Sequence, residues 1–211
     1  MTEKKYGEPL VRMRDLSVRD PELRSKYIQT LTRFLDHGML IKGHEVQVVE
    51  EQLNSLTSKK HNIRVSCASS GLLIALQAAN IKPGDEVITT PLSWLMTSSV
   101  IAQIGAIPIF VDVCDDYNMD ISRVANYITS RTKAVMPVHY YGKYLDTSPL
   151  RKLCDKHNLV LIEDCAQAAG SSVDGLLAGH NSDISVISFG PMKNIAALGD
   201  LGVVSTNDDS L

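Results

Sequence analysis

The sequence predicts an α/β protein built on a mainly parallel sheet, and three observations support this prediction. Between residues 62 and 206, short β-branched segments alternate with segments of helical periodicity. Residues 159–162 are apolar on both faces of an expected strand, as in buried parallel sheets. Turn signals such as Pro83-Gly84 separate the segments. Alternating strands and helices form crossover units, so we expect one layered domain.

Composition excludes several classes of protein. The 211 residues are 44% apolar and 21% charged, with a net charge of -3, which fits a cytoplasmic globular protein and gives no sign of nucleic-acid or membrane binding. No apolar run could span a bilayer, and the polar N-terminus lacks a signal peptide. The four cysteines form no CxxC pair, so we expect reduced, mostly buried thiols. No two histidines have ligand spacing, so no metal site is expected.

The first elements in order are an arm and two helices. Residues 1–19 lack a sustained period and are expected to form an N-terminal arm, with residues 20–211 forming the domain. Asp20-Pro21-Glu22 is typical of a helix start, and Gly38 of its end. A second amphipathic helix follows Gly43. These helices either cover a face of the domain or meet a partner subunit.

The remaining elements alternate. Strands are expected at 62–67, 86–90, 108–113, 133–139, 159–164, 183–189 and 202–206, and helices at 69–80, 96–105, 122–129 and 147–157. The sequence stops at residues 207–211, directly after the last strand. We therefore expect either that another chain closes the domain or that the sequence is truncated.

A single lysine follows the strand at 183–189. That strand is broken by Gly190-Pro191, and Lys193 comes next. The carboxyl end of a strand is where α/β proteins bind ligands, and an amine there can act as a nucleophile when its pKa is lowered. Taken alone, Lys193 is more simply a solvated residue at the start of a helix.

Two further segments have functional interpretations. Ser69 and Ser70 lie where a strand meets a helix, and the free amides of a helix N-terminus suit a phosphate, although plain capping by Ser69 is favoured in isolation. There is no nucleotide-binding glycine motif. Trp94, the only tryptophan, follows a strand and could equally stack on a planar ligand or anchor the core.

Acidic and polar residues follow the other strands. Glu163 and Asp164 end a buried strand, where a carboxylate is costly unless a cation pairs with it, and Gln167 follows; a turn cap by Asp164 is the alternative. His139 could be an acid, a base, a stacking group or a satisfied strand-end histidine. Ser188 could donate to a phosphate. A lysine, an acid, a flat ring and phosphate donors match pyridoxal 5'-phosphate, which takes an amine as a Schiff base and needs a protonated ring nitrogen.

Several motifs resemble the DegT/DnrJ/EryC1/StrS family of pyridoxal-phosphate sugar aminotransferases over residues 24–208. They are Pro83-Gly-Asp-Glu-Val-Ile, Gly105-Ala-Ile-Pro-Ile-Phe-Val-Asp112, Pro137-Val-His-Tyr-Tyr-Gly142, Glu163-Asp-Cys-Ala-Gln-Ala168, Ser188-Phe-Gly-Pro-Met-Lys193-Asn and Gly199-Asp-Leu-Gly-Val-Val-Ser-Thr-Asn207-Asp. The resemblance implies the large domain of a fold type I transferase, with helices on both faces of the sheet, in a homodimer with composite active sites.

The resemblance also implies the role of individual residues. Lys193 falls on the Schiff-base lysine, Asp164 on the carboxylate facing the pyridine nitrogen, Gln167 on the contact to the phenolic oxygen, Trp94 on the stacking ring, and Ser69, Ser70 and Ser188 on phosphate contacts. A lysine at 193 argues against the sugar dehydratases of the family, which have a histidine there. Two motifs depart from the family: Cys67-Ala68-Ser69 replaces Ser-Gly-Thr, and Gly199-Asp-Leu-Gly202 replaces Gly-Glu-Gly-Gly.

The implied function is transfer of an amino group from an amino acid, glutamate or glutamine, to a keto-sugar that is nucleotide-linked. Such a reaction serves amino-sugar, polysaccharide or secondary-metabolite biosynthesis. Family members continue into a small C-terminal domain that this sequence lacks. The alternative expectation is therefore a truncated, non-catalytic remnant that binds the cofactor weakly or acts only as a partner subunit.

Overall fold

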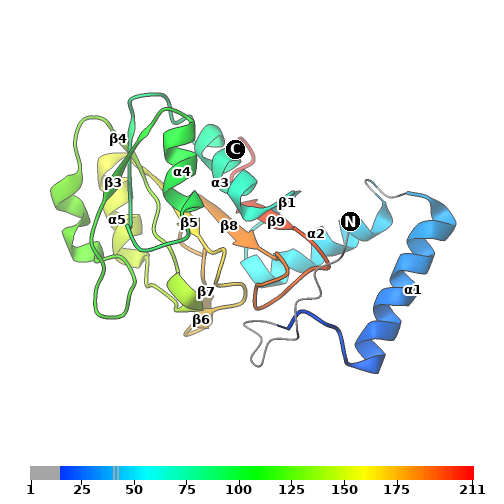
Figure 1. Cartoon of the computed structure of the whole chain (residues 1–211). Helices are drawn as coiled ribbons and strands as arrows, with labels where there is room; N and C mark the ends of the chain where they lie inside the picture. The colour runs from blue at the N-terminus through cyan, green and yellow to red at the C-terminus, as the bar shows by residue number, and fades with distance from the viewer. Residues whose placement is uncertain (1–14, 40, 42) are drawn as a thin grey trace, which may run out of the picture. The chain divides into compact units, whose positions relative to one another are not determined.

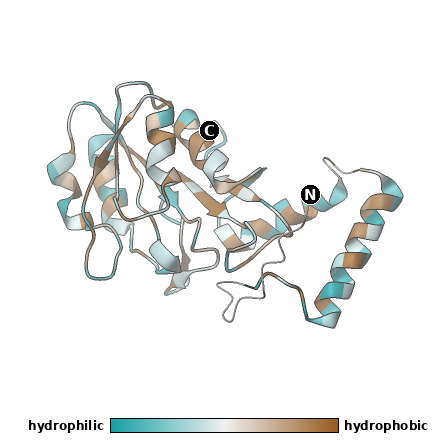
Figure 2. Cartoon of the chain, in the orientation of Figure 1, coloured by the Kyte–Doolittle hydropathy of each residue, from teal (hydrophilic) through white to brown (hydrophobic). Residues whose placement is uncertain are grey.

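The computed structural model describes residues 15–39, 41 and 43–211, so most of the expected arm lies outside the described residues. The chain divides into two compact units, residues 1–43 and 44–211. The first contains α1 (Pro21–His37), which begins where Asp20 Oδ1 accepts the Leu23 N–H at 2.7 Å and ends at Gly38, with φ 67°. No residue of α1 is buried. Hydrophobic and hydrophilic residues alternate along the ribbon of α1 (Figure 2).

The second unit is organised around a seven-stranded sheet in the order β1-β9-β8-β5-β4-β2-β3 (Figure 1). β3, β2, β4, β5 and β8 are mutually parallel, whereas β9 is antiparallel to both β8 and β1. The expected mainly parallel sheet is therefore confirmed. The strands are β1 (His61–Val65), β2 (Glu86–Thr89), β3 (Ile107–Phe110), β4 (Thr132–Val135), β5 (Val160–Asp164), β8 (Ile184–Ser188) and β9 (Gly202–Thr206).

Helices cover both faces of this sheet. On one face, α3 (Ala68–Ala78) and α4 (Met96–Gln103) pack in a core with alternate strand residues such as Ile162 and Val186. On the other face, α5 (Ser148–His157) and the 3-10 helix η1 (Ile121–Tyr127) pack on β2, β4 and β5. Near β8 and β9, α2 (His44–Thr57) supplies Leu53 to a third cluster on that same face. Burying both faces removes the largest apolar area from water and stabilises the layers.

Three details differ from the sequence-based expectations. The helix expected at 122–129 is the 3-10 helix η1, and a second 3-10 turn, η2 (Tyr140–Gly142), follows β4. A small hairpin of β6 (Ser172–Val173) and β7 (Leu176–Leu177) was not predicted, because three of its four strand residues are exposed and show no burial pattern. Cys154 and Cys165 are buried and Cys67 is half-buried, but Cys114 is exposed in the turn after β3, so the expectation of buried thiols holds fully for two of the four cysteines.

Among the helices of the described residues, none combines the length and the apolar character needed to cross a bilayer.

Candidate active site

One edge of the sheet collects the residues singled out in the sequence. β2, β4, β5 and β8 are parallel neighbours, so their carboxyl ends meet at the same edge. β1 runs in the same direction, because both β1 and β8 are antiparallel to β9. Trp94, His139 and Lys193 follow β2, β4 and β8, and Asp164 is the last residue of β5. The topology therefore brings these segments together.

Asp164 is the buried acid of this edge. Asp164 is the last residue of β5 and is 3% exposed, and its Oδ1 accepts the N–H of Ala166 at 3.0 Å. This bond makes Asp164 a turn cap, which the sequence offered as the alternative to a functional role. Its Oδ2 accepts the hydroxyl of Thr97 at 2.8 Å, a contact that sequence reasoning missed. Burial raises the pKa of the Asp164 carboxyl, while the Ala166 N–H, the Thr97 hydroxyl and the positive charge of Lys193 act in the opposite direction.

Lys193 faces this acid from a turn. The expected helix start is absent: residues 191–192 form a turn after β8, and the Lys193 N–H donates to the Gly190 carbonyl at 2.9 Å. The side chain is half-buried, and its charge acts on Asp164 from across the edge. The amine of Lys193 and the buried carboxylate of Asp164 therefore interact electrostatically at the carboxyl edge of the sheet.

Gln167 is held by the loop after β4. Its Oε1 accepts the Tyr141 N–H at 3.0 Å, so the side-chain amide keeps its two N–H donors for other partners. Tyr141 and Gly142 both have left-handed backbones, with φ 52° and 80°. A Cβ on Gly142 would lie 2.8 Å from the Gln167 carbonyl oxygen. The close approach of the two loops therefore requires glycine at this position.

Trp94 is not a core anchor in the described chain. The residue is 70% exposed, and its carbonyl accepts the Thr97 N–H at 3.0 Å at the start of α4. Of the two interpretations open from sequence, the exposed ring is consistent with stacking on a ligand or a partner. The turn that carries Trp94 also carries Thr97, which contacts Asp164.

The start of α3 differs from the expected cap. Cys67 is the N-cap residue and makes no side-chain capping bond, so capping by Ser69 was wrong. Gly71 is the first residue whose N–H reaches back to the Cys67 carbonyl, at 3.0 Å. The amides of residues 68–70 therefore belong to the open first turn, where an anion is favoured. Hydrogen bonds from the Ser70 hydroxyl and N–H lower the pKa of the Cys67 thiol.

Gly202 joins this turn to Ser188. In the sheet, Gly202 pairs with Ser188 on one side and Val65 on the other. A Cβ on Gly202 would lie 2.4 Å from the Cys67 carbonyl carbon and 2.6 Å from the Ala68 nitrogen. Only glycine allows β9 to approach the turn this closely. The two groups of expected phosphate donors, at 69–70 and at 188, thereby flank the same glycine.

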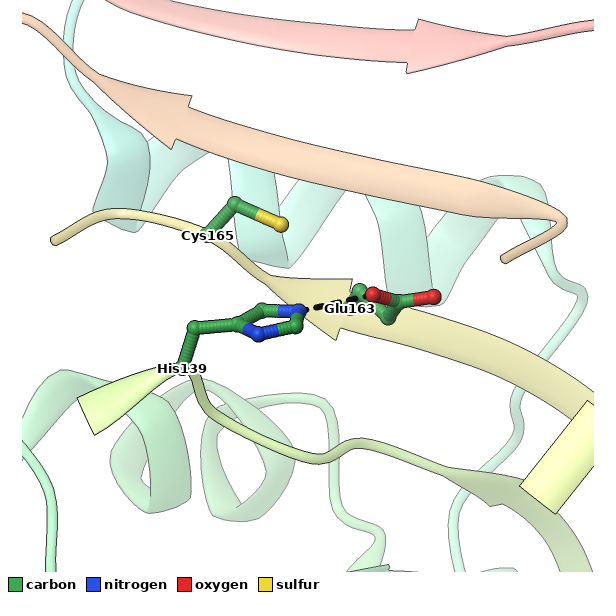
Figure 3. Close-up of side chains that lie close together, drawn as sticks. All are labelled: His139, Glu163 and Cys165. Carbon is green, nitrogen blue, oxygen red and sulfur yellow. Dashed lines mark hydrogen bonds and ion pairs between the residues drawn. The ribbon is translucent and has the colours of Figure 1, made fainter. Parts of the chain in front are cut away.

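His139 and Glu163 form a separate buried pair on the other side of β5 (Figure 3). The His139 Nδ1 accepts the Leu145 N–H at 3.0 Å, so Nε2 carries the proton that it donates to Glu163 Oε2 at 2.7 Å. Glu163 also accepts the Thr147 hydroxyl and the Gly179 N–H, at 3.0 and 2.9 Å. His139 is therefore a satisfied histidine, the more conservative of the interpretations open from the sequence.

Cys165 lies beside this pair, and with His139 and Glu163 it brings one possible metal-ligand atom per residue within 4.8 Å of the others. The donors are already committed. Both ring nitrogens of His139 and both oxygens of Glu163 have protein partners. Burial raises the pKa of the Cys165 thiol well above its usual value, which keeps the sulfur protonated. The cluster is built as a hydrogen-bond network, not as a cation site.

Comparison with known proteins relates the chain to curated sugar aminotransferases. A UDP-N-acetyl-3-dehydro-alpha-D-glucosamine 3-aminotransferase of Acidithiobacillus ferrooxidans is 38% identical over 94% of this chain and 54% of its own length. A dTDP-3-amino-3,4,6-trideoxy-alpha-D-glucose transaminase of Micromonospora megalomicea subsp. nigra is 40% identical over 88% of this chain and 50% of its own. The chain thus spans about half the length of the curated relatives it matches.

Solved structures agree with the sequence relatives. The DesV protein of S. venezuelae, in complex with a ketimine intermediate, has a TM-score of 0.88 and 34% identity over 93% of this chain and 53% of its own. The NtdA protein of Bacillus subtilis, with bound cofactor PMP, has a TM-score of 0.86 and 30% identity over 92% and 44%. A model of the DegT/DnrJ/EryC1/StrS aminotransferase family matches residues 21–211. The chain belongs to the DegT/DnrJ/EryC1/StrS aminotransferase family.

Proposed function

We propose that this protein is a pyridoxal 5'-phosphate-dependent aminotransferase that acts in the cytoplasm on a nucleotide-linked keto-sugar. The observation that carries the proposal is the buried carboxylate of Asp164 facing the charge of Lys193 at the carboxyl edge of the sheet. A buried acid of this kind needs a positive partner. The protonated ring nitrogen of the cofactor is such a partner, and an amine across the edge supplies the second attachment.

The residues at this edge fit the cofactor in the chemistry of their donors. Asp164 has four acceptor positions as a carboxylate, and Ala166 and Thr97 occupy two of them, so acceptor capacity remains for a ring N–H. The open first turn of α3 supplies amides suited to a phosphate. The contact of Gly202 with Cys67 and Ala68 leaves no room for a side chain there, which brings β9 and Ser188 up to the same turn.

Each residue then has a role toward the cofactor. Lys193 would hold it through Nζ, Asp164 would keep a proton on the ring nitrogen, and Trp94 would stack on the ring. Gln167 would donate from its free amide N–H groups to the phenolic oxygen. The phosphate would be bound by Ser69, Ser70 and Ser188. When bound, pyridoxal 5'-phosphate supplies an aldehyde that takes up amines and a ring that withdraws electrons from the attached carbon.

Lys193 has a second role after its amine is displaced by the amino donor. Once released from the cofactor, its Nζ would act as a base that carries the proton between the α-carbon of the donor and C4′ of the cofactor. A turn position gives the long side chain this reach. Asp164 stays buried throughout, so the negative charge behind the ring is not screened by water.

The substrates and the assembly are inferred from the relatives. One curated relative is named for a dehydro-sugar carried on UDP and the other for an amino-sugar carried on dTDP, which supports a nucleotide-linked keto-sugar as acceptor. Glutamate or glutamine as the amino donor follows from the family resemblance alone. We also propose a homodimer. Large apolar side chains at the catalytic edge are exposed in the single chain, as expected if a second copy covers them: Trp94, Leu95, Tyr141, Met192 and Leu198.

The test is a cofactor titration of the purified protein, followed by visible absorption. Pyridoxal 5'-phosphate added to the wild type is expected to give a band distinct from that of the free cofactor. Lys193→Ala should lack this band, and Lys152→Ala, an exposed lysine of α5, should keep it. Equal spectra for the wild type and Lys193→Ala would refute the role of Lys193.

A turnover assay separates the proposed enzyme from a remnant that only binds the cofactor. Glutamate or glutamine is supplied with a panel of nucleotide-linked keto-sugars, and the aminated product is measured. Amine transfer that depends on Lys193 supports the proposal. A Lys193-dependent band with no transfer from any donor would instead favour the non-catalytic remnant.

A further inference from the structure

Asp164 is supported by a short chain of hydroxyl groups. The Thr97 hydroxyl lies 2.8 Å from Asp164 Oδ2, and the Ser93 hydroxyl lies 2.8 Å from the Thr97 hydroxyl. Thr97 is 2% exposed, in the first turn of α4, and Ser93 is half-buried one helical turn earlier. The contacts therefore run from the turn after β2 to the acid at the end of β5.

The direction of these bonds follows from the number of protons. An ionised carboxylate can only accept, so the one hydroxyl proton of Thr97 points to Asp164. Thr97 then has only lone pairs left, and the Ser93 hydroxyl must donate to it. Hydroxyl groups bonded in series polarise one another, which strengthens the final bond to the carboxylate.

We propose that Thr97, supported by Ser93, is a positioning residue that fixes the orientation of the Asp164 carboxylate toward the cofactor. A carboxylate on a flexible χ2 torsion has no single preferred orientation. Here each oxygen is fixed by one donor, Oδ1 by the Ala166 N–H and Oδ2 by the Thr97 hydroxyl. The remaining acceptor positions are thereby directed before any ligand binds. This inference rests on the proposed function, in which Asp164 faces the ring nitrogen.

The turn before α4 also connects Thr97 to Trp94. Trp94 lies between Ser93 and Thr97, and its carbonyl accepts the Thr97 N–H at 3.0 Å. The hydroxyl chain therefore ties the segment that carries the exposed ring to the acid on β5. The two groups proposed to contact the cofactor ring from different strands share one support.

The charge state of Asp164 depends on the groups that face it. Burial raises the pKa of its carboxyl, and three groups oppose burial: the Ala166 N–H, the Thr97 hydroxyl and Lys193 from the turn after β8. His139, in the loop after β4, also faces Asp164 but is neutral in the hydrogen-bond arrangement described above. Removing the Thr97 hydroxyl takes away one of the three opposing groups. The Asp164 carboxyl would then keep its own proton to a higher pH. In the proposed complex it would also take the proton from the ring nitrogen of the cofactor more readily.

The experiment uses three variants at the hydroxyl groups of Thr97 and Ser93 and one matched control. Thr97→Val removes the hydroxyl and keeps the shape, Thr97→Ser keeps the hydroxyl, and Ser93→Ala removes the second hydroxyl. Thr147→Val is the control: Thr147 is 1% exposed and donates to the neighbouring carboxylate, Glu163, at 3.0 Å, but on the other face of β5. Urea unfolding of each protein reports any purely structural cost.

Two measurements decide the proposal. The first is a carbon-13 NMR titration of the Asp164 carboxyl in the protein without cofactor. The second is a titration with pyridoxal 5'-phosphate, with the visible band recorded against pH. Thr97→Val is expected to raise the midpoint of the Asp164 titration and to weaken cofactor binding by about tenfold, the loss of one bond to a charged group. Ser93→Ala should have a smaller effect in the same direction, and Thr97→Ser should restore both measurements.

Several outcomes would overturn the proposal. An Asp164 midpoint that is the same in Thr97→Val and wild type would show that the hydroxyl does not act on the carboxyl. A normal band and normal affinity in Thr97→Val, or equal losses in Thr147→Val, would show that Thr97 does not position the acid for the cofactor. If the wild type gives no Lys193-dependent band, the proposed function fails, while the NMR titration still decides the coupling of Thr97 to Asp164.

Discussion

The backbone N–H of Tyr141 donates to Oε1 of Gln167 at 3.0 Å. An N–H group can only donate, so this bond sets which side of the Gln167 amide carries oxygen. The acceptor is used inside the protein, and both amide N–H donors are left for a ligand. A loop from β4 thereby determines the chemistry that a loop from β5 presents.

The first prediction concerns Gly142, which lies against the same loop. Gly142→Ala would place a methyl 2.8 Å from the Gln167 carbonyl oxygen at φ 80°. We expect a loss of about 3 kcal/mol in the free energy of unfolding, from backbone strain and the clash together, and weaker cofactor binding. Gly175→Ala is the control, because Gly175 has φ 79° and no atom within 4 Å of the added methyl.

The two contributions separate in this comparison. Gly175→Ala carries the cost of the left-handed backbone alone, about 1 kcal/mol, and should bind the cofactor as the wild type does. Urea unfolding and the visible cofactor titration measure both quantities. Equal losses in the two variants would show that the approach of Gly142 to Gln167 contributes nothing.

Much of this architecture could be predicted from the sequence. The parallel sheet follows from the alternation of strands and helices, and the placement of Trp94, Asp164 and Lys193 at one edge follows from their positions at the carboxyl ends of parallel strands. Helix α1 was predicted because Asp20 and Gly38 have local roles as caps. Such features depend on neighbours in the sequence or on the period of burial.

What could not be predicted depends on contacts between distant segments. Thr97 carries no local signal that its hydroxyl meets Asp164, which lies 67 positions away in the sequence. Glu163 and Asp164 looked like one acidic pair, but successive strand residues point to opposite faces, and their side chains have separate partners. The close approach of Gly202 on β9 to the backbone of Cys67 and Ala68 likewise has no local signal in the sequence.

The second prediction concerns Glu163, whose two oxygens accept from His139, Thr147 and the Gly179 N–H. Glu163→Gln places an NH2 group either against the His139 and Gly179 donors or against the Thr147 hydroxyl, which must then turn its proton away to accept. In both arrangements the charged acceptor of the His139 bond is lost. We expect a loss of about 3 kcal/mol in the free energy of unfolding, measured by urea denaturation. Asp155→Asn is the control, because it removes an exposed partner of Arg151 and should cost about 0.5 kcal/mol. An unchanged urea midpoint for Glu163→Gln would contradict the assignment of both oxygens as acceptors.

The third prediction is a dependence of stability on pH that originates at Glu86, at the opposite end of the strands from the carboxyl edge of the sheet. Glu86 starts β2, is 2% exposed and accepts the Thr129 hydroxyl at 2.5 Å and a bond from Arg131. The Thr129 hydroxyl, followed by Arg131, lowers the pKa of the Glu86 carboxyl below its ordinary value. The unfolded chain therefore binds a proton at a higher pH than the folded chain does.

The sign follows from that difference. Because the folded pKa of Glu86 is the lower one, its stabilisation is complete above the unfolded value, about 4.3, and is lost as the pH falls through the folded value. Glu86→Gln should lower the free energy of unfolding by about 1.5 kcal/mol at neutral pH and should lose less further stability in acid than the wild type. Glu51→Gln, an exposed change on α2, controls for the loss of one carboxylate. Urea unfolding between neutral pH and about pH 3 measures how steeply the free energy of unfolding falls with pH. The same fall in the wild type and in Glu86→Gln would show that the bonds from Thr129 and Arg131 do not hold Glu86 ionised.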